Sequence, residues 1–497
     1  MVKNIMTDLD SMDFNFSGIE TFEELKKEYF TFKGIEIPPM IVEAYEFAFA
    51  KHDGQLRVVS GKPYVTHCLT VAVYTLRLGL DDTSIAASLI HDTVEDTDTK
   101  IDEIEKLFGI EVAFIVDALT IVTDIYDIAV NNVTDSNMES EVFLSRKIIL
   151  KASEDIRVIM IKLCDKMHNL LTQSDEKKAS SARRVKMIWE PLAEYVGLYK
   201  FKRKFQDEVF RILDPINYKN AREAISIYVD KNKNIFKDFL ESLQHIIDES
   251  RIEHYQKDAR IKTVHSFYEK LKRKQKNLDF SKLDKTRDIF ACRVLVESIQ
   301  DCYLLLGLIH GKYEYFQEEY DDYIVRPKAN GYRSIQTMIS FGDIFIEVQI
   351  KTFTMHEFNE YGPASHITYK NKAIKGSDVV WMKEMSNIDM NKDTKINVFA
   401  KSVFVFTPKG KIIRLDEGSN PLDFAYHVHT SIGNRFLGAK VNGKIVEKEY
   451  KLKTGEVCEI LTGKVDHPKA DWIKQVKMSH SRSQIRRSIL KLSINSA

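Results

Sequence analysis

Cysteine is scarce in this sequence, and the short glycine-rich motifs of common nucleotide-binding folds are missing. Only five of the 497 residues are cysteine, and no two of them form a Cys-x-x-Cys pair. We therefore expect a reducing compartment, the cytoplasm, and neither a disulfide framework nor a structural zinc site. Without a GxxxxGK[ST] or GxGxxG motif, a P-loop domain and a protein kinase domain are not expected either.

Long apolar runs are also missing. No uninterrupted apolar run approaches the length of about 18 residues that a membrane span requires. The N-terminus reaches Asp8 and Asp10 without an apolar core, so we expect neither a signal peptide nor a membrane partner. The 73 basic residues balance 73 acidic residues, and any site for a polyanion must therefore be local. A chain of this length is expected to form about three domains.

The pattern of apolar residues changes twice along the chain. Residues 20 to about 225 repeat apolar residues at helical spacing, which predicts an all-α region. After a boundary at Asp214-Pro215, residues 230–257 predict an amphipathic helical connector. An α+β region follows, and short strands from Ser402 to Thr462, with a turn at Asn442-Gly443, predict a small β-grasp-like module. In the α+β region we expect helices at 260–277, 299–310 and from about 353, and strands at 289–296, 337–341 and 344–350.

The octapeptide at residues 89–96, Leu-Ile-His-Asp-Thr-Val-Glu-Asp, carries the first chemical pattern. If the segment is one helix, His91 lies one turn before Glu95 and Asp92 one turn before Asp96, so that all four share one face. An adjacent His and Asp can both bind a divalent metal, and the two later carboxylates can orient or deprotonate a water. A solvated acidic helix end is the alternative interpretation.

Two further segments favour the metal site. His67 opens an apolar helix, and Asp165 lies on or just after a buried apolar run. An unpaired carboxylate costs several kcal/mol in such a place, and a metal ion would remove that cost. Imidazoles with carboxylates and no thiolate indicate Mn, Fe, Zn or Mg. The predicted ligands are His67, His91, Asp92 and Asp165.

A second pattern lies in the α+β region, where the strongest basic cluster runs from Lys257 to Arg287. On the predicted helix, Lys262, Ser266 and Lys270 share one face, as a triphosphate site would need, although a lysine-rich helix can also be a solvated surface. Asp288 and Glu347 can hold Mg²⁺ and take a proton, and Tyr332 offers a stacking face for a base. Five further polar side chains complete the predicted substrate site: Arg260, Arg293, Lys328, Asn330 and Gln349.

Together these motifs resemble the RelA/SpoT homologue family, the enzymes that make and degrade the alarmone (p)ppGpp in the bacterial stringent response. The resemblance covers roughly residues 38 to 490. The motifs at Gly54-Gln55, Ser60-Gly61, His91-Asp92 and 161–172 resemble its HD-type hydrolase domain. The resemblance implies that His67, His91, Asp92 and Asp165 bind Mn²⁺ and that Glu95 and Asp96 serve the attacking water. It also implies that Arg57, Lys162, Asn169 and Thr172 line the guanosine nucleotide pocket.

Later motifs resemble the synthetase domain, which moves the pyrophosphate of ATP onto the 3′-hydroxyl of GDP or GTP. The resemblance implies that Arg260 and Lys262 contact ATP. The other expected substrate contacts are Ser266, Lys270, Arg293, Lys328, Asn330 and Gln349. The resemblance assigns Asp288 and Glu347 to Mg²⁺ and the hydroxyl group and stacks Tyr332 on guanine. Residues 403–455 resemble a TGS domain, which in long members contacts uncharged tRNA on the ribosome near the position of His429.

The implied architecture is a multidomain one: an all-α HD-type hydrolase, an α+β nucleotidyltransferase-like synthetase and a small β-grasp TGS domain. We expect an N-terminal extension at 1–37, the hydrolase at 38–200, a helical connector at 201–257, the synthetase at 258–380, the TGS domain at 400–463 and a C-terminal tail at 464–497.

Some positions depart from the family pattern. The spacing from Arg57 to Ser60 is one residue longer, Gln336 replaces the usual His, Lys351 the usual Arg, and Ile367 the usual Trp. Arg to Lys exchanges a bidentate fork for a point charge. Three hypotheses follow: a bifunctional enzyme of (p)ppGpp metabolism, a hydrolase whose synthetase only binds nucleotide and regulates, and a non-enzymatic ribosome or tRNA sensor.

Overall fold

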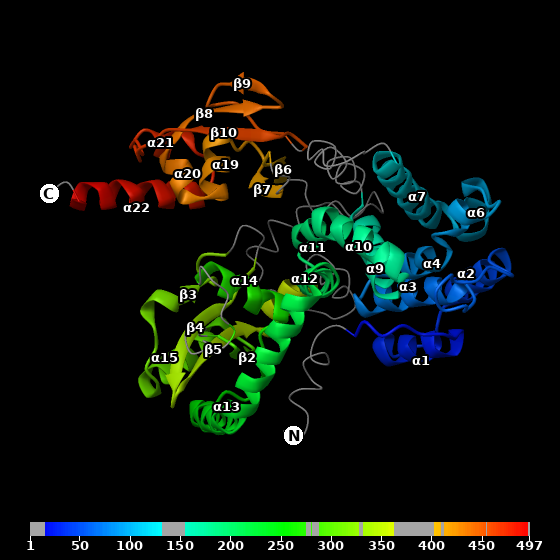
Figure 1. Ribbon diagram of the computed structural model, residues 1–497, viewed down its shortest axis with the longest axis horizontal. Helices are drawn as coiled ribbons and strands as arrows, with labels where there is room; N and C mark the ends of the chain where they lie inside the picture. The colour runs from blue at the N-terminus through cyan, green and yellow to red at the C-terminus, as the bar shows by residue number, and fades with distance from the viewer. Residues whose placement is uncertain are drawn as a thin grey trace.

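The structure, a computed structural model, describes residues 15–131, 155–274, 280, 288–327, 332–361, 402–408, 412–453 and 455–495. Figure 1 shows three bodies in chain order: a helical one coloured blue to cyan-green, an α/β one in green to yellow-green, and a small one in orange to red. Each has a hydrophobic core, although the first core also takes up Phe406 from the third body. Within the described part of the chain, no helix has the length and apolarity to cross a membrane.

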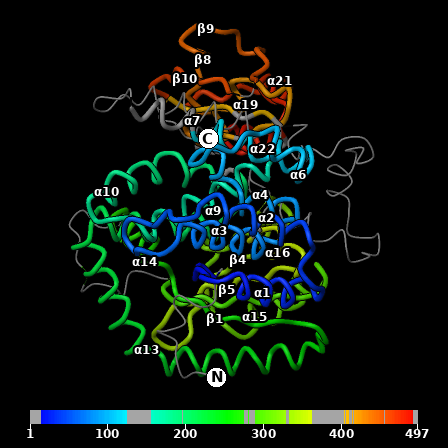
Figure 2. Tube along the Cα trace, turned by 90° about the vertical axis from the view of Figure 1, so that its right-hand side faces the viewer, coloured from blue at the N-terminus to red at the C-terminus, as the bar shows by residue number. Residues whose placement is uncertain are grey.

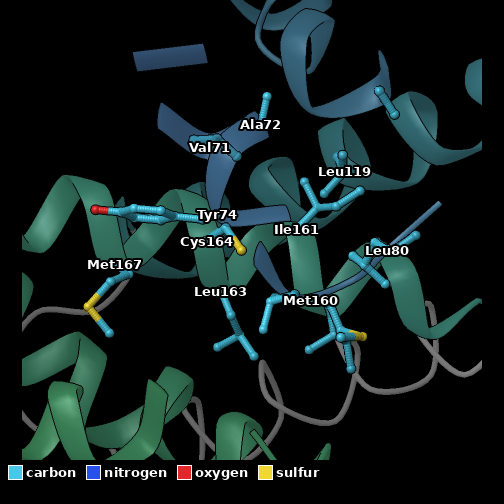
Figure 3. Packing of buried hydrophobic residues seen from close by; sticks show 14 of the residues in the cluster. Val71, Ala72, Tyr74, Leu80, Leu119, Met160, Ile161, Leu163, Cys164 and Met167 are labelled. Carbon is cyan, nitrogen blue, oxygen red and sulfur yellow. The ribbon is translucent and has the colours of Figure 1, made fainter. Parts of the chain in front are cut away.

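The first body is built around α3 and α9, whose side chains are buried at nearly every position. Figure 3 shows side chains from α3, α7 and α9, among them Tyr74, Leu119 and Ile161, gathered in one cluster. Each fully buried aliphatic side chain contributes roughly 1.5–3 kcal/mol, so these central helices hold the body together. The elements are α1 (Phe22–Lys33), α2 (Pro39–Lys51), α3 (Val65–Arg77), α4 (Asp82–Ile90), α5 (Thr93–Asp96), α6 (Ile101–Phe108), α7 (Ile110–Asn131), α9 (Ile156–Thr172), α10 (Asp175–Arg184), a π-helical turn (Val185–Trp189), α11 (Glu190–Tyr195) and α12 (Tyr199–Leu213).

An ionic network fixes the start of α9. The guanidinium of Arg157, which is 1% exposed, donates to Asp155 Oδ2 at 2.6 Å, to Asp81 Oδ2 at 2.7 Å and to Glu111 Oε1 at 2.8 Å. Asp155 also caps the helix by accepting from the backbone N–H of Arg157. Because Asp81 caps α4 and Glu111 lies in the first turn of α7, one guanidinium joins the N-terminal ends of three helices.

The second body is a five-stranded sheet in the order β1-β2-β5-β4-β3, in which only β2 and β5 run parallel. Phe290 of β2 stacks on Phe236 of α13, and α15 also packs against β2 and β5. This face of the sheet is apolar, whereas the opposite face carries Arg293, Glu347 and Gln349. The elements are α13 (Pro215–Ser250), β1 (Tyr255–Ile261), α14 (Val264–Lys274), β2 (Phe290–Val296), α15 (Ile299–Lys312), a 3₁₀ turn (Gln317–Glu319), β3 (Asp321–Asp322), β4 (Ile335–Phe341), β5 (Ile344–Thr352) and α16 (Phe353–Tyr361).

The predicted helix at 260–277 is wrong at its start. Residues 255–261 form β1, and α14 begins only at Val264. Arg260 therefore lies on a strand, opposite Ala291 of β2. The basic composition favoured a helix, but pairing with a strand some thirty residues later overrides that local preference. The strands expected at 289–296, 337–341 and 344–350 are present as β2, β4 and β5.

The third body combines a three-stranded sheet, β10-β8-β9, and a two-stranded sheet, β6-β7, with short helices. Asn442 and Gly443 form the predicted turn between β8 and β9, and both have positive φ, as a tight hairpin requires. The expected tail is instead partly helical, and its Trp472, Val476 and Ile485 belong to this core. The elements are β6 (Ser402–Phe406), β7 (Ile412–Asp416), α19 (Pro421–Val428), α20 (Thr430–Asn434), β8 (Phe436–Val441), β9 (Lys444–Val446), β10 (Cys458–Thr462), α21 (Trp472–Gln475) and α22 (Ser479–Asn495).

The segment expected to be one connector divides into two different helices. Phe201, Phe205 and Val209 of α12 belong to the first core, whereas the long helix α13 lies against the second. Asp214 caps α13, and Pro215 occupies its first turn, where a missing N–H does no harm. In the turned view, the strands of the third body lie at one end of the molecule and α13 at the other (Figure 2). The first body thus extends to α12.

The network of Arg157 makes a stability prediction. Arg157→Leu leaves the fully buried Asp155 carboxylate without its partner, and we expect it to destabilise the first body by about 3–5 kcal/mol. Thermal unfolding followed by circular dichroism should show a midpoint several degrees lower. Lys178→Ala, which removes a surface pair with Asp175, is the matched control and should leave the midpoint unchanged. Equal effects of the two variants would show that the network does not join the helices.

Candidate functional site

Three helices of the first body bring the predicted metal ligands together. His67 lies in the first turn of α3, His91 and Asp92 follow the end of α4, and Asp165 lies in the middle of α9. The ligand atoms of His67, His91 and Asp165 lie within 4.8 Å of one another. Asp92 adjoins this group, with Oδ1 3.0 Å from His91 Nε2 and Oδ2 3.4 Å from His67 Nε2. All four residues are buried.

The octapeptide is not one helix, contrary to expectation. Helix α4 ends at Ile90 and α5 begins at Thr93, with His91 and Asp92 between them. These two residues keep right-handed dihedral angles, so the backbone N–H of Asp96 still donates to the carbonyl of Asp92 at 2.8 Å. The predicted common face is wrong in part, because Asp96 is exposed while His91 and Asp92 are buried.

The donor set suits a divalent cation. Nε2 of His67 and Nε2 of His91 are buried and have no hydrogen-bond partner within the described residues. Buried polar atoms are nearly always satisfied, so two unsatisfied imidazole nitrogens that face a carboxylate indicate a missing ligand. The distance from His67 Nε2 to Asp165 Oδ1, 3.4 Å, brings the nitrogen and oxygen donors together. Two imidazoles and carboxylates are a common donor set for such ions.

The electrostatics favour the metal-binding protonation states of three of the four ligands, whereas for His67 burial is outweighed by the Asp165 and Asp92 carboxylates, which raise the pKa. Burial lowers the pKa of His91, so its imidazole is neutral, as a metal ligand must be. Burial opposes ionisation of Asp165, but Lys166 and Lys162 hold the pKa of that carboxyl well below its usual range. For Asp92, burial is likewise outweighed, chiefly by His91 and His67, and the pKa is lowered. The site therefore holds two ionised carboxylates.

Neighbouring polar groups orient these ligands. Nδ1 of His91 lies 2.8 Å from the carbonyl oxygen of Ser88, which places the proton on Nδ1 and leaves the Nε2 lone pair facing the site. The hydroxyl of Tyr64 donates to Asp92 Oδ2 at 2.7 Å, and Nδ1 of His67 lies 2.7 Å from Nδ1 of His168. The sequence analysis did not assign roles to Tyr64 and His168. Tyr64 lies three residues before His67, a helical spacing that could have indicated it.

Glu95 and Lys162 lie beside the cluster. Burial raises the pKa of Glu95 to about 7, which suits a group that exchanges a proton with water near neutral pH. Nζ of Lys162 lies 3.8 Å from Glu95 Oε1 and 3.3 Å from Asp165 Oδ2, and it donates to Thr123 Oγ1 at 2.5 Å. Lys162 is only 2% exposed. It is therefore placed to hold Glu95 and Asp165 rather than to present a free surface to a nucleotide.

Arg57, Asn169 and Thr172 form a contiguous polar group next to the cluster. Arg57 donates to Thr172 Oγ1 at 2.8 Å and to Asn169 Oδ1 at 3.3 Å, and Asn169 donates to Asp165 Oδ1 at 2.5 Å. The backbone of Arg57 pairs with Gly61 and Lys62 across a closed turn, so that Arg57 lies at the base of this loop. Val58, which is 97% exposed, lies in that turn.

The second candidate site lies around the polar side of the sheet in the second body. Asp288 precedes β2, and its Oδ2 accepts from Lys262 Nζ at 2.6 Å and from Lys270 Nζ at 2.7 Å. Its Oδ1 is buried and has no partner among the described residues. Asp288 has a φ of 128°, which is strained for a residue other than glycine. Lys262 and Lys270 both reach Asp288, although only Lys270 lies on α14 and Lys262 precedes that helix. Ser266 lies in the first turn of α14, and its hydroxyl contacts that of Thr263.

The strand register aligns the other predicted groups. Arg260 and Glu347 flank Ala291 in one row across β1, β2 and β5, and Arg293 lies beside Gln349 in the next. Gln349 donates to Glu347 Oε1 at 2.6 Å. Arg293 is held by Asp258 at 3.0 Å and by Glu360 of α16 at 3.4 Å. Lys328 and Asn330 lie outside the described residues.

Tyr332 joins two of the positions that depart from the family pattern, Gln336 and Lys351, whereas Ile367 lies outside the described residues. The hydroxyl of Tyr332 accepts from Gln336 Nε2 at 2.9 Å, and Nζ of Lys351 lies 5.6 Å from its ring centroid. Lys351 is buried, and this burial lowers its pKa to about 7. The replacement of Arg by Lys thus gives a cation that titrates near neutral pH. Glu360, which contacts Arg293, was not predicted; it lies on α16, and nothing in its local sequence distinguishes it.

Three family models match the chain in succession. The one described as an HD domain matches residues 44–199, the region found in RelA / SpoT proteins matches 259–374, and the TGS domain matches 403–462. A GTP pyrophosphokinase of Myxococcus xanthus is 37% identical over 467 residues, which are 90% of this chain and 60% of that protein. A guanosine-3′,5′-bis(diphosphate) 3′-pyrophosphohydrolase of Aquifex aeolicus is 35% identical over 471 residues, 91% of this chain and 64% of that protein.

This chain belongs to the RelA/SpoT family. The expected fold class, an HD-type domain followed by a synthetase-type domain and a TGS domain, is confirmed. Among solved structures, one of a metazoan orthologue of SpoT matches 35% of this chain and 95% of its own length, at 25% identity and a TM-score of 0.25. The chain spans about 60% of the length of the curated relatives it matches. The HD domain and the His–Asp donor set together indicate a divalent metal site.

The donor set predicts stabilisation by metal. We expect Mn²⁺ to raise the melting temperature of the protein, because at a concentration of 100 times Kd binding adds about 2.7 kcal/mol to stability. Asp165→Ala and His91→Ala should abolish the increase, and EDTA should reverse it. His245→Ala, which removes an exposed histidine on α13, is the control and should keep the full increase. A metal response that survives loss of Asp165 would place the ion elsewhere.

Proposed function

We propose that this protein degrades and makes (p)ppGpp in the cytoplasm. The first body removes the 3′-pyrophosphate, and the second transfers pyrophosphate from ATP to the 3′-hydroxyl of GDP or GTP. The observation that carries the hydrolase proposal is the buried His67, His91 and Asp165 group, in which the two Nε2 atoms have no hydrogen-bond partner among the residues that the structure describes. The relatives' names, a pyrophosphokinase and a pyrophosphohydrolase, support both halves.

In the hydrolase, His67, His91, Asp92 and Asp165 would hold the metal, which we propose is Mn²⁺. When bound, such an ion makes water a stronger nucleophile and neutralises charge on a phosphate. Glu95, with a pKa of about 7, accepts the proton of the attacking water, and Lys162 fixes the carboxylate for that step. Asp96, exposed beside it, orients the water from the solvent side.

The nucleotide pocket of the hydrolase would lie along the last two turns of α9. Arg57, Asn169 and Thr172 form a polar surface there, and Asn169 also contacts Asp165. One side chain thus links the pocket to the metal ligands. Arg57 carries the positive charge that a guanosine phosphate needs. Lys162 is buried and acts on the nucleotide only through Glu95 and Asp165, which it contacts.

In the synthetase, Asp288 and Glu347 would hold Mg²⁺ and receive the proton of the 3′-hydroxyl. Lys262 and Lys270, which now neutralise Asp288, would bind the ATP phosphates together with Arg260 and Ser266. The triphosphate would then pair with the ammonium groups of Lys262 and Lys270, which would leave the carboxylate of Asp288 to hold the metal. Tyr332 would stack on guanine, with Arg293 and Gln349 on the acceptor side. Lys328 and Asn330 are proposed to contact the acceptor nucleotide on the family resemblance alone.

A second candidate is a hydrolase whose synthetase domain only binds nucleotide. Two observations favour it: Gln336 hydrogen-bonds Tyr332 where the family usually has a histidine, and Lys351 is buried with a lowered pKa. A lysine of that kind is a weaker phosphate partner than an arginine. For the TGS domain we propose contact with ribosome-bound uncharged tRNA, which the exposed His429 at the start of α20 can reach.

Paired single substitutions test the two-site proposal. We expect Asp96→Ala to lower Mn²⁺-dependent loss of ppGpp by about 10²–10⁴-fold and Glu347→Ala to lower transfer from ATP to GDP similarly, each sparing the other reaction. Nucleotides separated by chromatography give both rates. Asp98→Ala and Asp343→Ala, which remove exposed carboxylates nearby, are the controls. No transfer by the unaltered protein would leave the second candidate, and loss of both activities in either variant would contradict two separate sites.

Opposed activities in one chain would consume ATP without net product, so we expect each site to suppress the other through residues 200–257. GDP with a non-transferable ATP analogue should slow ppGpp hydrolysis by about 5–150-fold, the usual range of coupling between two sites. The measurement is the hydrolysis rate against analogue concentration, with Glu347→Ala as the variant that weakens the effect. A rate that does not depend on the analogue would refute the coupling.

A further inference from the structure

Helix α12 has two faces that belong to different bodies. Phe201 and Phe205 are fully buried in the first core. Tyr199, Arg203 and Asp207 are spaced four residues apart and therefore share another face of the same helix. Figure 1 places α12 between the helices of the first body and α14 of the second, and α12 packs against α9, α14 and α16.

The first contact of this face is ionic. Nη2 of Arg203 lies 3.2 Å from Oε2 of Glu360 on α16, while Oε1 of Glu360 lies 3.4 Å from Nη1 of Arg293. Glu360 is only 4% exposed. Each of its two carboxylate oxygens therefore holds one arginine, one from the first body and one from the polar face of the sheet. Asp258 holds the other end of the Arg293 guanidinium.

The two remaining residues of this face contact other parts of the same site. The ring of Tyr199 meets that of Tyr332 edge to face at 6.3 Å. Asp207 accepts from the backbone N–H of His265 at 2.9 Å, in the first turn of α14. That turn also carries Ser266, and the next turn carries Lys270. An acidic side chain at a helix N-terminus satisfies a free N–H and fixes where the helix begins.

We propose that α12 completes the synthetase site: Arg203 is a positioning residue for the acceptor nucleotide and Asp207 a positioning residue for ATP. This inference rests on the proposed synthetase function. Arg203 acts through Glu360 on Arg293, which lies in one row with Gln349 on the acceptor side. Asp207 acts through the start of α14 on Ser266 and Lys270, on the donor side.

The reason that Arg203 matters is the charge it takes from Glu360. Without Arg203, the ion pairs that the buried carboxylate keeps within the described residues are Arg293 at 3.4 Å and His356 at 3.8 Å, while Lys351 and Lys200 also act on its charge. Arg293 would then be bound more tightly between Glu360 and Asp258 and would have less capacity for a phosphate. A lysine at position 203 could restore the balance, because a single guanidinium nitrogen makes the contact.

The test compares substitutions on one helix in the full chain. Arg203→Ala should raise the KM for GDP about tenfold, roughly the effect of losing one charged hydrogen bond, and leave the KM for ATP within twofold. Asp207→Ala should raise the KM for ATP about threefold, with little change for GDP. Arg203→Lys and Asp207→Asn, which keep a donor and an acceptor, should restore most of the affinity. Lys202→Ala removes a cation that pairs with Glu194 of the first body and is the control.

Direct binding separates this inference from the proposed function. Calorimetric titration of GDP into the unaltered protein and into Arg203→Ala requires no transfer, so the affinity difference is measurable even if the unaltered protein has no synthetase activity. Hydrolysis of ppGpp is measured on every variant, at a temperature below each melting midpoint, and should match that of Lys202→Ala. Equal nucleotide affinity in Arg203→Ala and the unaltered protein, or equal weakening of ATP and GDP, would overturn the assignment.

Discussion

The constraint on which the rest of this structure depends is the burial, in the first body, of metal-ligand atoms that have no hydrogen-bond partner among the described residues, the Nε2 atoms of His67 and His91. His67 and Asp165 lie on α3 and α9, and His91 follows α4, so the imidazole nitrogens are surrounded by buried side chains, and among the described residues the polar groups nearest to them are the Asp92 and Asp165 carboxylates. Such a cluster is stable only where surrounding helices are held rigidly. The guanidinium of Arg157, which joins the N-terminal ends of α4, α7 and α9, supplies that rigidity about two turns before Asp165.

The two candidate sites solve the same electrostatic problem differently. In the first, Lys162 and Lys166 contact one carboxylate oxygen, Asp165 Oδ2, at 3.3 and 3.2 Å, while the other oxygen, Oδ1, faces the imidazole of His67. In the second, Lys262 and Lys270 contact Asp288 directly and neutralise it. The first arrangement keeps a negative site ready for a cation, whereas the second exchanges partners only when an anion draws the lysines away.

The sequence predicted the parts of these sites that depend on local spacing. His67, His91 and Asp165 could be proposed as ligands because helical periodicity and donor chemistry are visible within short segments, and β2, β4 and β5 followed from alternation. The interruption between α4 and α5 at His91 and Asp92 has no proline or glycine to mark it. Residues 255–261 became a strand through pairing with distant β2. The contact from Arg203 to Glu360 spans 157 positions, and no local pattern carries such information.

The closed turn after Arg57 has a consequence for how this family can vary. Because the backbone of Arg57 bonds to Gly61 and Lys62, the loop is tied off at its base, and Val58 projects into solvent. Adding one residue to such a loop costs little closure entropy, since that cost grows only with the logarithm of loop length. A change of length at this tip therefore need not move the guanidinium of Arg57, which contacts Asn169 and Thr172. The contacts of Arg57 with Asn169 and Thr172 are thus separated from the exposed tip of the loop.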